Sequence, residues 1–280
     1  MIDLATELLR AHICLKQEPA WQRDAVKELT GRYRGLFDRI GRETITRLKA
    51  VGVPGTDLQR QVLVMALVDA IDEFGEISFD GTWEAARHGG QRVVGDLRGQ
   101  GVRGISWHEP SPDVEAALRN RIFQASERTM NRIVGDVKGV LLDSHQQGFG
   151  IDKTATALGD KFEDMKRYEL ERIARTEIHE ADGAAADLQM KELGVEYEQW
   201  ITALDGRERE SHAELHGEII RVGDTFSNGL EYPGDMSGEP EDYINCRCRA
   251  RPYILPRGKR APGNMRRFRE EDLLTVEKGT

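Results

Sequence analysis

A long helical period in the middle of the chain constrains the fold more than any other feature. Ser111-Pro112-Asp113 combines a capping serine, a proline suited to the first helical turn and an early acid, which together mark a helix start. A helix of about thirty-five residues follows, or near 50 Å at 1.5 Å per residue, and it ends at Gln147-Gly148-Phe149-Gly150. A helix this long usually packs against a neighbour, and Gly150 is the expected domain boundary. The apolar positions that carry the period are Val114, Leu118, Ile122, Ala125, Met130, Ile133, Val137 and Leu141.

The same spacing predicts further helices on either side. Before residue 111, apolar residues three or four apart predict a helix over Pro19–Val51 and another over Leu58–Phe74 that ends at Gly75. Phe79–Leu97 is a further candidate, interrupted by Gly89-Gly90. After Gly150, two more helices are expected over 151–161 and 164–193. The first half of the chain is therefore expected to be mainly α-helical.

Beyond Gly194 the period changes from helix to strand. Residues 195–202, 218–222 and 247–254 alternate like strands, and Gly- and Pro-rich loops separate them. The sequence thus predicts an α+β fold, with a mainly α-helical N-terminal half of long helices, then two helices and a small β-sheet with long loops. Three regions are expected: a helical region over 1–150, a domain over 151–256 and a basic, flexible tail over 257–280.

Composition excludes several classes of protein. The net charge of −9 over 280 residues argues against a generic nucleic-acid binder, which needs a basic face. Three cysteines, Cys14, Cys246 and Cys248, make no disulfide framework, so a reducing compartment is expected. The N-terminus lacks a signal pattern, and no stretch approaches the roughly 18 apolar residues of a membrane span. We expect a protein made in the cytoplasm, with no membrane partner.

Residues 200–248 gather the chemically versatile side chains of the chain. On a helix, His212 and His216 would share a face at i and i+4, and Cys246 with Cys248 would complete four ligands for one metal ion. This spacing makes zinc the candidate cofactor, with His212, His216, Cys246 and Cys248 as its ligands. The alternative is that the cysteines are small buried hydrophobes, since Cys-x-Cys is tighter than the usual Cys-x-x-Cys.

An ordered series of motifs resembles the Mu F-like family of phage head morphogenesis (minor capsid) proteins over about residues 150 to 254, and the order rather than any single motif carries the resemblance. One departure is His216, where family members often carry an acid before the glycine. The motifs are Ile173-Ala174-Arg175-Thr176-Glu177-Ile178, Gly194-Val195, Trp200, Asp205-x-Arg207-x-Arg209-x-x-His212, Gly217, Asp224-x-Phe226, Pro233-Gly234-Asp235 and Ile244-Asn245-Cys246-Arg247-Cys248.

The resemblance implies a role in phage assembly. Members are minor capsid proteins encoded beside the portal, associated with portal and procapsid, and carried inside the head. It therefore implies a virion protein made in the bacterial host cytoplasm, with portal and capsid or scaffold proteins as partners. A helical region over 1–150 suits docking on such partners. No catalytic residue follows from the resemblance.

The motif residues leave structural alternatives open. Asp205, Arg207 and Arg209 are either a solvated turn and helix start, or part of a buried polar network in which Asp205 or Glu177 holds an arginine. Arg175 with Glu177 is either a solvated face or a pair that reaches toward the sheet. Both readings are structural. Trp200 and Gly217 complete the structural motif.

The tail carries a run of basic residues. Such a run is usually a solvated end, but in a DNA-filled head it could contact the phosphates of packaged double-stranded DNA without sequence specificity. The residues are Arg257, Lys259, Arg260, Arg266, Arg267 and Arg269.

Two function classes remain. A non-enzymatic assembly protein is favoured because no Ser-His-Asp order, phosphate-cradling glycine loop or His-Glu-x-x-His helix is present. The alternative is a metal-dependent hydrolase or nuclease-like effector that uses the His/Cys cluster, with Glu214 as its base. A full set of four zinc ligands would describe a closed structural site better than a catalytic one.

Overall fold

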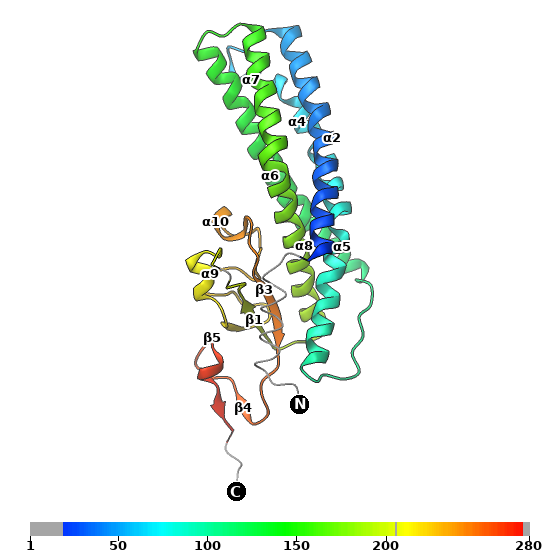
Figure 1. The fold of residues 1–280 in the computed structure, drawn as a ribbon, viewed down its shortest axis with the longest axis vertical. Coiled ribbons are helices and arrows are strands. Elements are labelled where there is room, and N and C mark those ends of the chain that lie inside the picture. The colour runs from blue at the N-terminus through cyan, green and yellow to red at the C-terminus, as the bar shows by residue number, and fades with distance from the viewer. Residues whose placement is uncertain (1–18, 205, 277–280) are drawn as a thin grey trace. The chain divides into compact units, whose positions relative to one another are not determined.

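The computed structural model describes residues 19–204 and 206–276 and confirms the α+β class (Figure 1). Long helices come first and a small antiparallel sheet lies late in the chain. The helices are α2 (Ala20–Val51), α3 (Asp57–Leu63), α4 (Met65–Asp69), α5 (Ile71–Gly99), α6 (Pro112–Gln146), α7 (Ile151–Asp164), the π-helix η1 (Met165–Glu169), α8 (Leu170–Glu192), α9 (Glu210–Glu214), α10 (Pro240–Tyr243) and the 3-10 helix η2 (Glu270–Asp272). The strands are β1 (Tyr197–Ile201), β2 (Ile219–Arg221), β3 (Arg249–Tyr253), β4 (Lys259–Arg260), β5 (Arg267–Phe268) and β6 (Leu274–Thr275).

The chain forms two compact units, and their boundary does not fall at Gly150. The first unit contains Trp83–Leu118 and the chain from Ile178 onward, with the first residues of α2. The second contains Asp24–Thr82 and Arg119–Glu177. Each unit is therefore assembled from segments far apart in sequence, which a linear reading of helix ends does not reveal. In place of a boundary at Gly150, the division falls within α2, α5, α6 and α8.

The second unit is helical, and its core follows the expected period. Tyr33 and Phe37 of α2 are fully buried, and both rings pack on Phe74 of α5, with the Tyr33 and Phe74 rings stacked 4.6 Å apart. Surface ion pairs also join its helices, for example Arg132 of α6 with Glu169 of η1 at 3.2 Å. The predicted helices over Pro19–Val51 and from Pro112 to Gln146 are both confirmed.

The region from Leu58 to Leu97 differs from the prediction. Val64 and Ala70 separate three helices where one was expected, and α5 continues through Gly75 and Gly89-Gly90. A Cβ added at Gly75 would lie 2.9 Å from the Phe123 ring. These glycines therefore permit close approach of neighbouring chain segments and do not end the helix.

The two helices expected after Gly150 form one nearly continuous rod of backbone. The helix α7 passes into α8 through the five-residue π-helix η1. A π-helical turn accommodates an extra residue that interrupts the i to i+4 hydrogen-bond ladder. The break expected near residue 162, between the two predicted helices, is therefore not a loop.

The first unit contains a four-stranded antiparallel sheet in the order β3-β1-β2-β5. Every residue of the central strand β1 is buried, and Trp200 pairs with Ala250 of β3. The three predicted strands are confirmed as β1, β2 and β3, each shorter than the alternating pattern suggested. The strand β5 was not predicted.

The expected flexible tail from residue 257 is partly folded. Phe268 of β5 is only 3% exposed and packs edge-on against Tyr197, with ring centroids 5.4 Å apart. Ile219 and Tyr253 belong to the same apolar cluster. The segment up to residue 276 therefore contributes to the core, and β4 pairs with β6 beside it.

Among the described helices, none combines the length and the apolar character that a membrane crossing requires.

Candidate functional site

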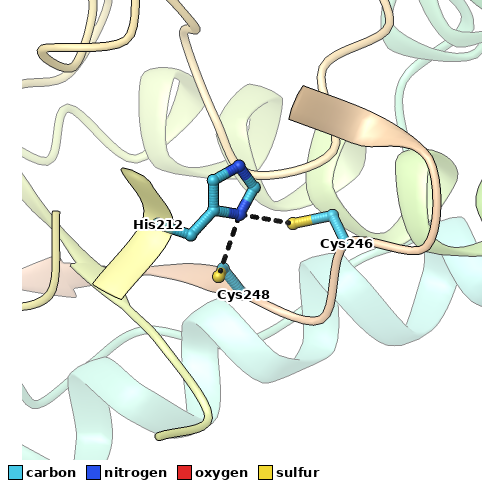
Figure 2. Close-up of side chains that lie close together, drawn as sticks. All are labelled: His212, Cys246 and Cys248. Carbon is cyan, nitrogen blue, oxygen red and sulfur yellow. Dashed lines mark hydrogen bonds between the residues drawn. The ribbon is translucent and has the colours of Figure 1, made fainter. Parts of the chain in front are cut away.

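Three of the four predicted metal ligands come together in the first unit. His212 lies on the short helix α9, and Cys246 and Cys248 lie between α10 and β3. Nδ1 of His212 is 3.7 Å from Sγ of Cys246 and 3.6 Å from Sγ of Cys248 (Figure 2). The three ligand atoms all lie within 4.8 Å of one another, and all three residues are buried. Both thiols are free of disulfides.

Local backbone geometry turns both cysteines toward His212. Asn245 adopts a left-handed conformation with φ of 55°, which asparagine tolerates better than most residues, and it redirects the chain just before Cys246. The chain then extends into β3. Cys246 and Cys248, just before this strand, both direct their sulfur atoms at His212.

The apolar surroundings hold the site in place. Trp200 of β1 is fully buried and packs edge-on against the His212 ring at 5.4 Å. Trp200 donates a hydrogen bond from Nε1 to Oγ1 of Thr202 at 3.1 Å, and Thr202 donates one to the carbonyl oxygen of His212 at 2.7 Å. The central strand therefore positions His212 through Thr202. The apolar cluster around the thiols consists of Trp200, Leu215, Ile220, Phe226, Leu230, Cys246 and Cys248.

Electrostatic effects give the two thiols different pKa values. A hydrogen bond from Cys246 and, against the effect of burial, the neighbouring His212 lower the pKa of Cys248 to about 4. The hydrogen bond to Cys248 and burial raise the pKa of Cys246 well above its usual value. Cys248 is thus the thiolate of the pair and Cys246 its donor. A thiolate is the form of cysteine that binds metals.

The other nitrogen of the His212 ring faces a carboxylate. Its Nε2 is buried and lies 3.7 Å from Oδ1 of Asp242, on α10. The two ring nitrogens of a histidine are distinct, and the partner of one determines the role of the other. The 3.7 Å separation is too long for a hydrogen bond, and Nε2 has no hydrogen-bond partner among the described residues, while Nδ1 is the nitrogen that faces the two sulfurs.

A small cavity adjoins the cluster. Its volume is about 20 Å³, and its lining includes the three ligand residues. One water molecule needs roughly 10–15 Å³ of such space. Arg207, Arg209 and Arg247 also line the cavity, together with Glu208.

His216 does not join this group of described residues. The helix α9 ends at Glu214, so the two histidines do not share a helical face as the spacing suggested. Nδ1 of His216 instead accepts a hydrogen bond from the backbone N–H of Thr202 at 3.1 Å, at the end of β1. The expected i and i+4 geometry fails because the helix is too short.

The other motif residues mainly shape the loops around the site. Arg209 is the N-terminal cap residue of α9, and its guanidinium donates to the carbonyl oxygen of Ile244, just before the cysteines. Gly217 has φ of 83° and donates its N–H to Trp200 at 2.9 Å, in a turn that favours glycine. Arg207 is exposed. Asp205 lies outside the described residues.

Arg175 and Glu177 belong to the second unit and do not act as one pair. Arg175 forms an ion pair with Glu171, one helical turn earlier on α8, at 2.9 Å. Glu177 is buried and accepts a hydrogen bond from the hydroxyl of Tyr33 in α2. The buried alternative therefore holds for Glu177, and its partner comes from the long helix rather than the sheet.

The basic residues of the C-terminal segment divide into two groups. Arg269 donates to the carbonyl oxygens of His216 and Glu214, and Arg267 donates to the carbonyl oxygen of Thr225 at 3.0 Å. These two stabilise the fold. The side chains of Arg257, Lys259, Arg260 and Arg266 are exposed. A cavity of about 280 Å³ nearby includes Arg221, Arg260 and Arg266 in its lining.

Comparisons with known proteins identify the class to which this domain belongs. Residues 135–251 match the family described as phage Mu protein F like protein, and the match includes all three residues of the metal-ligand group. This match confirms the resemblance to the Mu F-like head morphogenesis family that the ordered motifs indicated.

The chain is also similar to a curated phage protein. The chain is 26% identical over 160 residues to the minor head protein GP7 of Bacillus phage SPP1. The similarity covers 52% of this chain and 51% of the relative, so the chain spans about half the length of that protein. No solved structure matches the chain.

Sequence reasoning missed two residues that the site uses. Asp242 carried no signal, because its relation to His212 depends on how the loop of α10 folds back. Thr202 was visible only as the end of an alternating strand, although it lies two residues after Trp200 and so on the same face of the extended chain.

Proposed function

We propose that this chain is a phage minor head protein that acts in head assembly without catalysing a reaction. The observation that supports the proposal is the Mu F-like match over residues 135–251, together with the similarity to a minor head protein. By the same reasoning its partners are the portal protein and capsid or scaffold proteins, and its place is the interior of the head. The long helices of the second unit offer extended charged surfaces for such docking.

Purified heads test this proposal. We expect the chain to co-purify with heads and to resist added protease until the shell is opened. Co-expression with the portal protein of the same phage should yield a complex on size-exclusion chromatography, and an unrelated tagged protein serves as the control. Cleavage of the chain in intact heads would refute an interior location, and its absence from heads would refute the assembly role.

We further propose that four exposed bases of the C-terminal segment, Arg257, Lys259, Arg260 and Arg266, contact packaged DNA. The net charge of −9 makes any such contact local. Binding to phosphates releases counterions, so affinity falls steeply with salt, with a log–log slope of about −0.9 for each phosphate neutralised. Arg267 and Arg269 are left out because their guanidinium groups hold backbone carbonyl oxygens of the fold, whereas Lys259 contacts only the exposed hydroxyl of Thr275.

The DNA contact is tested by substitution rather than truncation, because β5 lies in the same segment. Alanine at all four positions should abolish most salt-dependent binding to duplex DNA. A matched control replaces four exposed bases of α2, Lys27, Arg34, Arg42 and Lys49, and changes the net charge equally. Equal losses in both variants would reduce the effect to net charge and overturn the proposed contact.

The alternative of a metal-dependent hydrolase is weaker on the geometry. The residue assigned as its base, Glu214, is exposed and is not part of the cavity lining. Glu208 does line the cavity, but its carboxylate accepts hydrogen bonds from the N–H groups of Gly206 and Arg207. A zinc-loaded sample that hydrolyses phosphodiester or peptide substrates, and loses this activity in Glu208→Gln, would revive the alternative.

A further inference from the structure

We propose that His212, Cys246 and Cys248 bind one zinc ion, with Asp242 orienting His212 from behind and a water molecule in the fourth position. The inference goes beyond the assembly role and does not depend on it. Its basis is the geometry of the three side chains of Figure 2, together with Asp242 and one small cavity in the first unit.

The separations of the ligand atoms fit a tetrahedral ion. With zinc bonds of about 2.3 Å to sulfur and 2.0–2.1 Å to nitrogen, a tetrahedral angle separates a sulfur from a nitrogen ligand by about 3.6 Å. The observed separations from Nδ1 of His212 are 3.7 Å to Cys246 and 3.6 Å to Cys248. An ion can therefore enter without a large movement of these side chains.

Hydrogen bonds alone explain the convergence of the three side chains less well than a bound metal ion does. A ring nitrogen carries either one proton or one lone pair, directed along a single line in the ring plane. Nδ1 of His212 nonetheless faces two sulfurs at nearly equal distances. One ion at the common centre satisfies all three atoms at once.

The donor set selects zinc from the common metals. Two thiolates and one imidazole are soft and borderline ligands, which suit zinc and do not suit calcium or magnesium. Their burial excludes the exposed oxygen ligands that those ions prefer.

Asp242 would orient the ligand His212 without binding the metal itself. A metal-bound histidine almost always donates its other ring N–H to a carboxylate, a carbonyl or a water, which fixes the tautomer and the ring orientation. Nε2 is the ring nitrogen of His212 on the side away from the sulfurs (Figure 2), and Oδ1 of Asp242 lies 3.7 Å from it. Its removal is expected to weaken binding without changing the number of ions bound.

The cavity of about 20 Å³ accommodates the fourth ligand. Its lining includes the three ligand residues, and its size suits one water molecule. Within the described chain, no other histidine, cysteine or carboxylate belongs to the ligand group.

A zinc ion here would stabilise the fold by cross-linking two loops. The residues on either side of the site belong to long loops with little regular structure, from Thr202 to Glu218 and from Val222 to Cys248. The ion would join α9 to the segment that enters β3. Because such a site does not exist in the unfolded chain, the free energy of metal binding adds to the free energy of unfolding.

Elemental analysis of the full-length protein, purified without chelator and then desalted, tests the proposal. We expect one zinc per chain, and a fall in melting temperature when a chelator removes it. Replacement of zinc by cobalt should give the absorption of a tetrahedral ion with a sulfur-to-cobalt charge-transfer band. Protein that takes up no metal even after incubation with excess zinc would overturn the proposal.

Variants assign the ligands. Cys246→Ser, Cys248→Ser and His212→Gln should each lose the stoichiometric ion, and the cobalt charge-transfer band should weaken in each cysteine variant. The matched control is His216→Asn, which keeps an acceptor for the Thr202 N–H and should retain one zinc. If a ligand variant does not fold, cobalt titration of the native protein against a thiol-alkylating reagent decides: bound metal should protect both thiols, and equal alkylation with and without metal would contradict the site.

Asp242→Asn separates the orienting role from direct ligation. We expect one zinc at saturation, an unchanged cobalt spectrum and an affinity lower by about 10- to 100-fold. A changed cobalt spectrum, or an unchanged affinity, would remove Asp242 from the proposed role.

Discussion

At the scale of single residues, Glu198 shows how strongly burial changes an acid. It lies in the middle of the central strand β1, is fully buried, and neither carboxylate oxygen has a hydrogen-bond partner in the described part of the chain. Burial, and then the negative charge of Asp187, raise its pKa well above the usual value. Lys191, the nearby cation, already bonds Asp187 and Glu231, each at 2.9 Å, so its lowering effect on the pKa of Glu198 is smaller than the effects of burial and Asp187.

This raised pKa predicts a pH-dependent stability. Below the unfolded pKa of about 4.3 both states hold the proton, and above it only the folded state does. The free energy of unfolding therefore falls as pH rises from about 4.3 toward the folded pKa. Glu198→Gln should remove this loss, so its melting temperature should exceed that of the native protein at pH 8 and nearly equal it at pH 4.

The neighbouring Glu196→Gln provides the comparison for thermal unfolding across this pH range. Glu196 is exposed and pairs with Arg221 at the surface, so its substitution should change the free energy of unfolding by less than about 0.5 kcal/mol at either pH. Parallel pH profiles for native protein and Glu198→Gln would show that Glu198 ionises normally in the folded state.

At the scale of elements, α5 passes through glycines that usually weaken a helix. A Cβ at Gly89 would lie 2.1 Å from the carbonyl oxygen of Asp182 in α8, and one at Gly90 would lie 3.0 Å from the Trp107 ring. Arg92, one turn further along α5, bonds both Asp182 at 2.8 Å and the carbonyl oxygen of Ala250 in β3 at 2.9 Å. The glycines let α5 approach α8 closely enough for Arg92 to join helix and sheet.

Two alanine substitutions on α5 distinguish the effect of packing on stability from the effect of helix propensity. Gly89→Ala should lower the free energy of unfolding by about 2 kcal/mol or more, because backbone must move to admit the new methyl group. Gly95→Ala, on the exposed side with open space around it, should raise it by about 0.5–1 kcal/mol. Denaturant unfolding measures both changes. A gain in both variants would mean that α5 and α8 do not pack this closely.

At the scale of the whole molecule, the C-terminal segment adds a strand to the sheet although it lies beyond the residues that match the family model. The Mu F-like match stops at residue 251, yet β5 pairs with β2 through Ile219 and Phe268. Arg269 also holds the turn that carries His216. The final segment therefore belongs to the fold of the first unit, in addition to offering exposed bases.

Removal of this segment should therefore be costly. Truncation after residue 256 exposes Tyr197, Ile219 and Tyr253, and Phe268→Ala alone should lower the free energy of unfolding by about 3–5 kcal/mol. Met265→Ala, at a side chain that is 44% exposed, is the control and should have little effect. Thermal unfolding compares the three proteins. An unchanged melting temperature on truncation would restore the interpretation of the segment as a flexible tail.

The sequence by itself determined the features that depend on neighbours along the chain. The helices α2 and α6, the strands β1 to β3 and the resemblance to the Mu F-like family all follow from local periods and ordered motifs. Periods of 3.6 and 2 residues are set by backbone geometry, so they can be recognised in the sequence before any tertiary contact is known.

Only the tertiary structure decided the features that depend on distant partners. These are the continuation of α5 through Gly89, the pairing of β5 with β2, the burial of Glu177 against Tyr33, and the choice of His212 with Asp242 over His216 at the thiols. In each case the deciding atom lies on a segment remote in sequence, and packing and hydrogen bonding across space override the local pattern.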